Sequence, residues 1–259
     1  MQSPDFGRTA ADYGRHRAGF PDSLFERLHA RGIGLPGQSV VDLGTGTGSL
    51  ARGFARRGCR VVGIDLSDAL LGQARRLDAE AGVEVEYRIA RAEATELAPA
   101  SADVVTAGQC WHWFDRPAAS REVARVLVES GSLVIAHFDW LPIAGNICEA
   151  TEELIQTHNP KWKFAGGLGV HPWWLRDLDE AGYCAIETFS YDVSVPYTHE
   201  DWRGRVRASA GVGAALSLAA IEAFDRALEE LLRRRFADSP LAVPHRVFAI
   251  VSRPPAPGS

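Results

Sequence analysis

Three glycines at alternate positions follow an acidic residue in the run Val40–Gly48, which reads VVDLGTGTG. Apolar and β-branched residues lead into Asp42, so the run predicts a buried strand that ends in a tight turn, with a helix beginning at about Ser49. Glycine allows positive φ angles and lets a ligand touch the backbone, and the amides at the start of a helix face such a ligand. The run therefore predicts a binding site at the end of this strand.

A second acidic residue, Asp65, follows the glycine turn at the distance expected for a nucleoside-binding site. The strand-like run 60–64 ends in Asp65, which comes 19 residues after Gly46. An acid at the tip of the second strand, roughly 20 residues past a glycine turn, is placed to accept hydrogen bonds from ribose hydroxyls. Together the turn and the acid predict a site for a cofactor that contains adenosine.

The spacing of the glycines indicates which cofactor. Dinucleotide-binding folds use G-x-G-x-x-G, and counting from Gly44 puts Ser49 where the third glycine belongs. The chain instead has D-x-G-x-G-x-G beginning at Asp42, which resembles motif I of the class I S-adenosylmethionine (SAM) methyltransferases. The resemblance implies that the turn holds the methionine part of SAM and that the acid anchors its ammonium group. The cofactor residues expected here are Asp42, Gly44, Thr45, Gly46, Asp65 and Leu66.

Two later segments extend the resemblance. Ala92 and Glu93 follow the strand-like run 83–89 and resemble the third-strand segment of the family, where a small residue and an acid bind the exocyclic amine of adenine. After the expected fourth strand the chain continues with Gln109 and then WHWF from Trp111. This aromatic run is similar to the type 11 group of small-molecule methyltransferases, which includes the trans-aconitate methyltransferase-like enzymes. Ala92, Glu93, Gln109 and Trp111 are therefore expected at the cofactor.

The N-terminal segment is similar to the Y-x-x-x-R-P-x-Y-P entry of the same subfamily. Tyr13 and Arg17 match it, whereas Ala18 replaces the usual proline and Phe20 the usual tyrosine. The resemblance implies that Tyr13 and Arg17 close over the cofactor, with the arginine near its carboxylate. It covers residues 8–140, and the remaining chain is not recognisably similar.

The residues that could do chemistry need a sheet to position them. Strands and helices alternate along the first half, with strands expected at 38–43, 60–64, 83–89, 103–107 and 132–138 and helices at 21–30, 49–57, 67–81 and 117–128. Such alternation implies a parallel sheet with helices on both faces, and ligands at the carboxyl ends of its strands. The fold class expected is α/β, a doubly wound, seven-stranded, mostly parallel and Rossmann-like sheet with an antiparallel last strand.

The second half of the chain has another character. Strands are expected at 185–197 and 245–252, and a helical insertion precedes each of them, at about 141–182 and 199–237. In the methyltransferase family, insertions at these places commonly form a lid over the acceptor site. Residues 1–259 are expected to form a single methyltransferase domain, with the proline-rich tail 254–259 loosely held.

Composition narrows the class of partner. The 259 residues are 46% hydrophobic and 24% charged, which is typical of a globular protein with a substantial core, and the net charge of −5 argues against nucleic acid. Four isolated cysteines without metal-binding spacing indicate free thiols, no metal and a cytoplasmic location. The start of the chain lacks the pattern of a signal peptide, and no apolar run approaches the ~18 residues of a membrane span. A monomer or homodimer acting on a small molecule is expected.

Methyl transfer from a sulfonium needs mainly alignment of the acceptor, and a general base only where the acceptor must lose a proton. His112 is the leading candidate for that base, against a structural role beside two tryptophans, Trp111 and Trp113, of which either could stack on adenine. His137 and Asp139 share one face of a strand and could act as a base or as a structural pair. His158, His171 and His199 have no metal-binding spacing. Arg203, Arg205 and Arg207 could form a solvated face or a clamp for an anionic acceptor.

The function expected is SAM-dependent transfer of a methyl group to an oxygen, nitrogen or carbon atom of a small molecule, with S-adenosylhomocysteine as product. One alternative is an enzyme of the same fold that binds SAM without methylating, such as a cyclase or isomerase. Another is a binding protein that senses SAM. An NAD-dependent oxidoreductase is more distant, because Ser49 and Asp42 oppose it.

Overall fold

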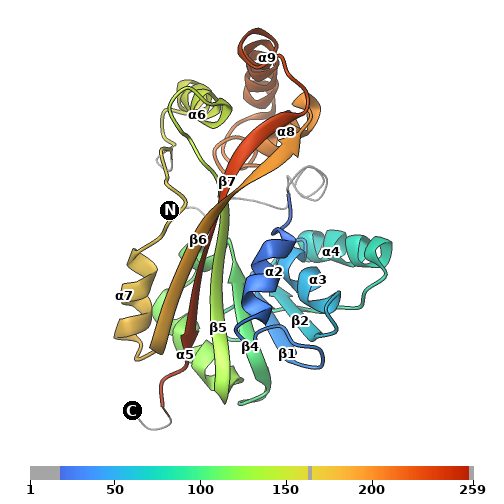
Figure 1. Ribbon diagram of the computed structural model, residues 1–259. Helices are drawn as coiled ribbons and strands as arrows, with labels where there is room; N and C mark the ends of the chain where they lie inside the picture. Colours follow the sequence, from blue (N-terminus) through green and yellow to red (C-terminus); the bar gives the residue numbers. More distant parts are fainter. Residues whose placement is uncertain (1–17, 163–164, 257–259) are drawn as a thin grey trace. The chain divides into compact units, whose positions relative to one another are not determined.

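The computed structural model describes residues 18–162 and 165–256 (Figure 1). Strands and helices alternate along the first half as the sequence predicts. The elements there are α2 (Asp22–His29), β1 (Ser39–Leu43), α3 (Ser49–Ala55), β2 (Arg60–Asp65), α4 (Asp68–Ala81), β3 (Glu86–Ile89), β4 (Ala102–Gly108), the 3₁₀ helix η2 (Trp111–Trp113), α5 (Arg116–Val126) and β5 (Leu127–Trp140). The second half contains α6 (Ile147–His158), α7 (Trp173–Glu180), β6 (Cys184–Tyr197), α8 (His199–Arg207), α9 (Leu218–Arg235) and β7 (Leu241–Arg253).

The strands form one seven-stranded sheet in the order β3-β2-β1-β4-β5-β7-β6. The pairs β1–β2, β1–β4, β2–β3 and β4–β5 are parallel, and β7 runs antiparallel. This arrangement confirms the expected doubly wound α/β class. The strand order reverses between β1 and β4, and ligands of such sheets bind at the carboxyl ends of the strands beside that reversal.

Several helix boundaries follow from residues that the sequence singles out. The Ser67 side chain accepts a hydrogen bond from the backbone nitrogen of Leu70 at the start of α4, and Gly82 ends that helix with a φ of 65°. Both are residues typical of these helix-capping positions. Asp115 caps α5 in the same way, with a proline in the first turn of the helix.

Three strands differ from their predicted spans by three or more residues at one end, among them β7, which begins at Leu241 rather than at residue 245. β3 begins at Glu86 rather than at residue 83, so only four residues pair with β2. β5 begins at Leu127, where a helix was expected to continue, because an irregularity in the β4–β5 register pairs Ala102 with Leu127 and Val104 with Ser132. Register irregularities depend on the partner strand, so periodicity within one segment does not reveal them.

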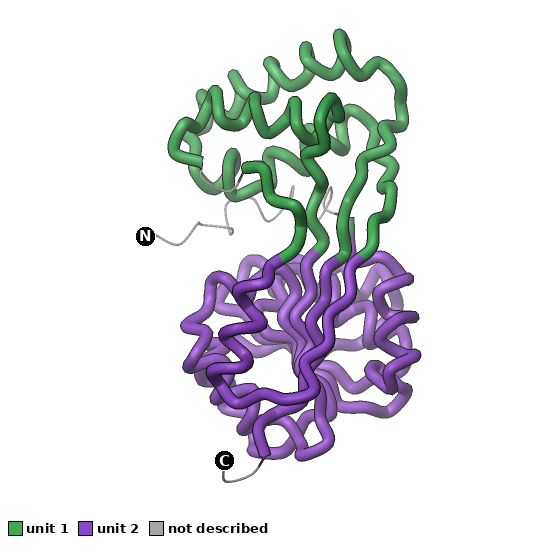
Figure 2. Tube along the Cα trace, turned by 60° about the vertical axis from the view of Figure 1, so that its left-hand side comes forward, with its two compact units in different colours: residues 1–18, 138–170, 191–247 green, residues 19–137, 171–190, 248–259 purple. Residues whose placement is uncertain are grey.

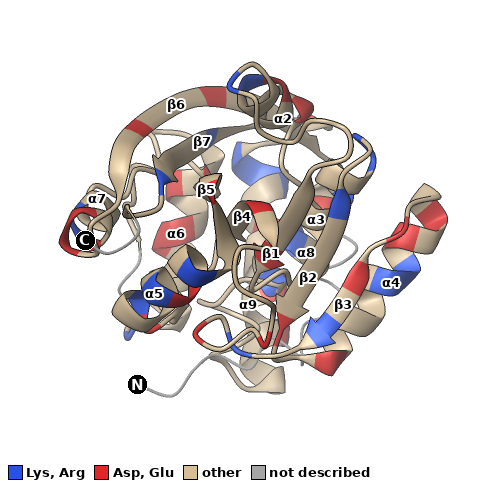
Figure 3. Cartoon of the chain, turned by 90° about the horizontal axis from the view of Figure 1, so that it is seen from below, with Lys and Arg blue, Asp and Glu red and all other residues tan. Residues whose placement is uncertain are grey.

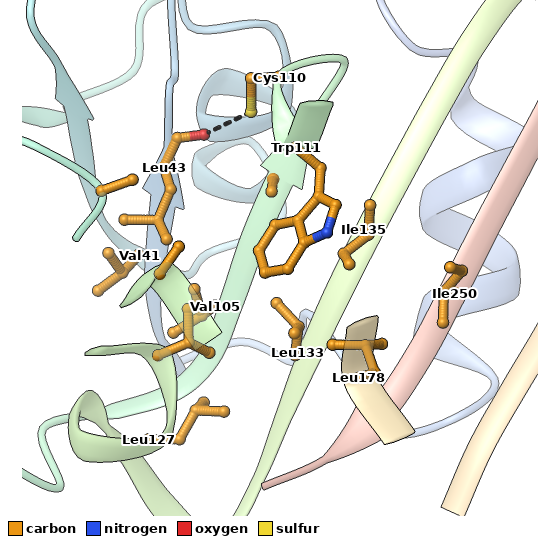
Figure 4. Packing of buried hydrophobic residues seen from close by; sticks show 14 of the residues in the cluster. Val41, Leu43, Val105, Cys110, Trp111, Leu127, Leu133, Ile135, Leu178 and Ile250 are labelled. Atoms are coloured by element: carbon orange, nitrogen blue, oxygen red, sulfur yellow. Dashed lines mark hydrogen bonds between the residues drawn. The ribbon is translucent and has the colours of Figure 1, made fainter. Parts of the chain in front are cut away.

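The chain divides into two compact units, coloured separately in Figure 2. Unit 2 comprises residues 19–137, 171–190 and 248–259. Helices α2, α3 and α4 lie on one face of its part of the sheet, and α5 and α7 lie on the other (Figure 1). On the second face a cluster of buried apolar side chains surrounds Trp111, with Val105, Leu133 and Ile135 among its neighbours (Figure 4).

Unit 1 comprises residues 1–18, 138–170 and 191–247. Helices α8 and α6 both contact α9, and their apolar faces bury Trp202, Phe224 and Leu228. Gly211 and Gly213 lie in the break between α8 and α9, where the sequence predicts an interruption. Of the expected insertion 141–182, α6 belongs to unit 1, whereas α7 packs Trp174 and Leu178 into the core of unit 2. Whether the inserted helices form a lid stays a prediction.

Candidate functional site

The carboxyl ends of β1, β2 and β4 meet at one edge of the sheet in unit 2. Leu43 of β1 pairs with Ile64 of β2 and with Ala107 of β4, so the residues that follow these three strand ends lie side by side. The glycine turn, Asp65 and Gln109 follow those strand ends, as the sequence predicts. Parallel pairing is the reason that residues distant along the chain converge here.

Asp42 is hydrogen-bonded to the glycine turn and to β4. Its carboxylate is buried, and it accepts hydrogen bonds from the Thr45 hydroxyl at 2.7 Å and from the Thr106 hydroxyl at 2.6 Å. Burial raises the pKa of Asp42 to about 6, although these two hydrogen bonds act in the opposite direction. The group therefore changes charge near neutral pH, which an exposed aspartate does not.

Two glycines of the turn are required for different reasons. Gly44 has a φ of 58°, and a Cβ there would lie 2.9 Å from the Cβ and Sγ atoms of Cys110. Gly46 has a φ of 56°, and a Cβ there would meet no atom of the described residues within 4 Å. Gly44 thus allows close packing of the turn, whereas Gly46 leaves backbone that no described residue covers at this point, as a ligand that approaches the main chain needs.

Asp65 connects the turn to the start of α4. One carboxylate oxygen accepts a hydrogen bond from the backbone nitrogen of Gly46, and the other accepts one from the backbone nitrogen of Ser67, both at 2.9 Å. A carboxylate has about four acceptor positions, so each oxygen can accept a further hydrogen bond from a ligand hydroxyl. The residue is only partly buried, which leaves that capacity accessible.

Exposed apolar side chains stand next to Asp65. Leu66 is 63% exposed, and Ile89, which pairs with Asp65 across β2 and β3, is 60% exposed. Apolar groups of this size on two adjoining strand ends offer flat contact area for a purine ring. Leu66 was an expected cofactor residue, whereas Ile89 was missed. Its position at the end of the third strand was the signal that could have identified it.

Ala92 and Glu93 follow β3, as expected, and take different positions. Ala92 is buried in the core of unit 2. The Glu93 carboxylate accepts a hydrogen bond from the backbone nitrogen of Asp115 at 2.9 Å and forms an ion pair with Arg91. Glu93 thereby connects the segment after β3 to the N-terminus of α5.

The two tryptophans in the segment after β4 differ in burial. Gln109 has a φ of 59°, and its backbone nitrogen donates to the carbonyl of Ala136. Trp111 is 0% exposed at the centre of the apolar cluster in Figure 4, whereas Trp113 is 39% exposed. Of the two rings, Trp113 is therefore the one that a ligand can reach, and Trp111 anchors the segment in the core.

Three histidines gather around one tryptophan in unit 2. The ring of His137 lies 5.5 Å from that of His112 and 4.3 Å from that of His171, measured between centroids. Trp174 of α7 stacks on His171 at 4.1 Å and lies 4.7 Å from His137. The sequence predicted roles for His112 and His137 but not for His171 or Trp174, because nothing in local spacing joins α7 to the end of β5.

This cluster bears on the expectation that the chain holds no metal ion. His137 and His171 each offer a nitrogen within 4.8 Å of the other. The absence of a metal stays a prediction.

Several other predicted residues lie in unit 1 or outside the described residues. Tyr13 and Arg17 fall outside the described residues, although Phe20, close behind them, donates its backbone N–H to the Ser49 hydroxyl. Arg203 and Arg207 pair with Asp225 of α9 in unit 1, and Arg205 lies over the Trp140 ring. His199 contacts the carbonyl of Phe236, and His158 lies against Phe224, also in unit 1. Asp139 is partly buried in β5.

Charged residues of both signs occur along the helices that flank the sheet in unit 2. Along α4 and α5 the basic and acidic side chains are interspersed rather than gathered by sign (Figure 3). Arg76 pairs with Glu80 on α4, and Arg125 pairs with Glu122 on α5. Among the described residues, we find no helix with the length and apolar character that a membrane crossing requires.

Known proteins resemble the chain, and the matched family profile covers the glycine turn. A family profile described as "Methyltransferase domain" matches residues 41–135, which lie within unit 2. The ubiquinone biosynthesis O-methyltransferase of Hahella chejuensis is 46% identical over 173 residues, which are 61% of this chain and 68% of the relative. The enzyme of the same name from Azoarcus is 35% identical over 46% of this chain and 56% of the relative. The chain spans about half the length of the first curated relatives that it matches.

Solved structures share the fold at lower sequence identity. The YcgJ protein of Bacillus subtilis superposes with a TM-score of 0.57 at 20% identity, covering 90% of this chain and 98% of that one. The phosphoethanolamine N-methyltransferase 2 of Haemonchus contortus in complex with SAM has a TM-score of 0.56 at 21% identity, covering 97% of this chain and 57% of its own. Membership of the trans-aconitate subfamily, oligomeric state and cytoplasmic location stay predictions.

Proposed function

Because the chain belongs to the class I SAM-dependent methyltransferases, we propose that it transfers the methyl group of SAM to an oxygen, nitrogen or carbon atom of a small-molecule acceptor. The observation that carries the proposal is the hydrogen bond from the Gly46 amide to Asp65, which couples the open glycine turn to the acid at the end of β2. A bound SAM would supply an electrophilic methyl group on a sulfonium centre.

The residues fit such a cofactor at each of its parts. The bare backbone at Gly46, with the negative charge of Asp42 beneath it, suits an amino acid group that carries an ammonium. Asp65 has acceptor capacity for two ribose hydroxyls. Leu66 and Ile89 offer exposed apolar area for the adenine ring. We assign Gly44, Thr45, Ala92, Glu93 and Gln109 to the surroundings of the same site, on the grounds of the family motifs that they match.

His112 is the residue that we propose as the general base for acceptors that must lose a proton. It lies directly after the buried Trp111 anchor and before the exposed Trp113, so the core fixes its backbone while a ligand can approach beside it. Its ring also contacts the ring of His137, which is buried and in contact with His171. A neighbouring imidazole can hold the base in one orientation, and we propose His137 for this supporting role.

Calorimetric titration with SAM, S-adenosylhomocysteine and NAD tests the cofactor assignment. We expect the first two to bind with micromolar affinity and NAD not to bind.

Asp65→Ala removes acceptors for charge-assisted hydrogen bonds worth ~1.5–3 kcal/mol each, so SAM affinity should decrease at least about tenfold. Asp68→Ala, which removes an exposed carboxylate three residues later, is the matched control and should leave the affinity unchanged.

The results of these titrations distinguish the proposed function from its alternatives. Binding of NAD alone would overturn the proposal. Binding of SAM without release of S-adenosylhomocysteine across a broad set of small-molecule acceptors would favour a protein that binds SAM without methylating. Unchanged SAM affinity in Asp65→Ala would refute the role given to that residue while leaving the family assignment intact.

A further inference from the structure

A buried polar network contacts the last residues of the glycine turn. Arg52 of α3 donates from Nη2 to the carbonyl of Thr47 at 2.7 Å, and its Nε atom lies 2.8 Å from Oδ1 of Asp78 on α4. The other oxygen of Asp78 accepts a hydrogen bond from the Tyr87 hydroxyl of β3 at 2.8 Å. The three side chains thus join two helices and a strand to the last residues of the turn.

Two glycines make room for this network. The Tyr87 ring crosses β2 at Gly63, where a Cβ would lie 2.6 Å from Cε1 of the tyrosine. The Tyr87 hydroxyl reaches Gly48, where a Cβ would lie 2.3 Å from it. Gly63 is therefore needed in the middle of β2, and Gly48 is needed at the back of the turn. The sequence motif accounted for neither requirement.

The members of the network are largely withdrawn from solvent. Asp78 is buried, and Arg52 is mostly so. Burial raises the pKa of the Tyr87 hydroxyl, and the bond to Asp78 raises it further, so the phenol stays protonated as a donor. Breaking one member of a buried charged network leaves its partners unsatisfied, which costs more than losing an exposed ion pair.

We propose that Arg52, Asp78 and Tyr87 are positioning residues that fix the turn Thr45–Gly48 in the orientation that binds the amino acid part of the cofactor. Arg52 holds the Thr47 carbonyl, which prevents the peptide units between Gly46 and Gly48 from rotating. The amide of Gly46 is held separately by Asp65. The turn is therefore fixed at two points, by one residue that contacts the ligand and by three that do not. This inference rests on the proposed function, because it assumes that the turn binds SAM.

Tyr87→Phe is the sharpest test, since it removes only the hydroxyl and keeps the ring on Gly63. The ligands are SAM, S-adenosylhomocysteine and 5′-methylthioadenosine, of which the last has the ribose and adenine but no amino acid group. We expect the affinity for the first two to decrease about three- to tenfold, the range of one lost hydrogen bond. The affinity for 5′-methylthioadenosine should stay unchanged, because Asp65 and the apolar contacts remain.

Two further variants control the measurement. Arg52→Lys keeps the charge but loses the planar fork that joins Thr47 to Asp78, and it should repeat the pattern of Tyr87→Phe. Tyr183→Phe removes another buried tyrosine hydroxyl of unit 2, which donates to the carbonyl of Ser120 at 2.8 Å far from the turn. It should lower stability without changing the affinity for any of the three ligands.

Two results would overturn the inference. One is unchanged SAM affinity in both Tyr87→Phe and Arg52→Lys. The other is an equal loss for SAM and for 5′-methylthioadenosine, which would indicate general loosening of the unit. Failure of the unaltered protein to bind SAM would instead refute the proposed function, so the two failures are distinguishable.

Discussion

One polar cluster from each unit can be compared. In unit 2, Asp65 binds the backbone amides of Gly46 and Ser67, and Arg52 binds the carbonyl of Thr47. In unit 1, Arg203 and Arg207 pair with the Asp225 side chain between α8 and α9. The first cluster therefore fixes the main chain of a turn, whereas the second holds two helices together.

This difference agrees with the position of the family-profile match, which lies within unit 2. A turn whose backbone faces a ligand needs particular residues at particular spacings, and the profile match at 41–135 covers that turn. Packing of helices can be satisfied by many apolar and charged combinations. The comparison leads to an expectation that changes in unit 2 alter binding or turnover, whereas changes in unit 1 alter stability.

The largest expected effect is that of His112→Gln in unit 2. If His112 removes the acceptor's proton, turnover should decrease about 10²–10⁴-fold, and the acid limb of the pH–rate profile should disappear. SAM affinity and thermal stability should change little, because the Trp111 anchor is kept. Single-turnover rates from pH 5.5 to 9 check this. A loss of turnover with the same pH profile as the unaltered protein would contradict the role of base.

The glycine turn and the acid after β2 could be predicted because their geometry depends on local backbone chemistry. Gly44, Gly46 and Asp65 lie at adjoining strand ends, as expected. The helix caps at Ser67 and Gly82 were predictable for the same reason. Each of these features is decided by residues close together in the sequence, or by one parallel crossover.

Features that depend on distant packing were not predictable. The stacking of His171 on Trp174, and the placement of both beside His137, require α7 to pack against the core of unit 2. The Arg52–Asp78–Tyr87 network likewise needs α3, α4 and β3 to be in place. Three charged or polar residues scattered over 36 positions show no spacing that a single sequence reveals.

An intermediate effect is expected from the titration of Asp42. With its pKa at about 6, the carboxylate loses its charge as the pH falls, and SAM affinity at pH 5 should be about tenfold lower than at pH 7.5. Asp42→Asn should bind weakly at both pH values. The pH dependence of stability has the opposite sign. Because the pKa of Asp42 is raised in the folded state, its contribution to the free energy of unfolding decreases as the pH rises from 3.8 to about 6. Calorimetry at the two pH values tests the prediction, and equal affinities would contradict it.

The smallest effect is expected in unit 1, from Asp225→Asn. Burial acts to raise the pKa of Asp225, but the hydrogen bonds and charges of Arg203 and Arg207 outweigh it, so the pKa is lowered. A lowered pKa contributes stability above the ordinary value near 4, and this contribution is lost as the pH falls through the folded-state pKa. Asp225→Asn should therefore lower the free energy of unfolding by about 1 kcal/mol at pH 7, a value reduced for partial exposure, and by less at pH 3.5.

Urea denaturation at both pH values measures this difference, with calorimetry of SAM binding alongside it. Glu229→Gln, which removes the more exposed partner of Arg203, is the matched control and should cost at most about 0.5 kcal/mol. SAM affinity should stay the same in both variants, since the cofactor residues proposed here from the described chain lie in unit 2. A marked loss of SAM affinity in Asp225→Asn with stability unchanged would contradict the expectation that unit 2 binds SAM and that changes in unit 1 affect only stability. Such a result would mean that the helices of unit 1 affect SAM affinity by something other than their packing.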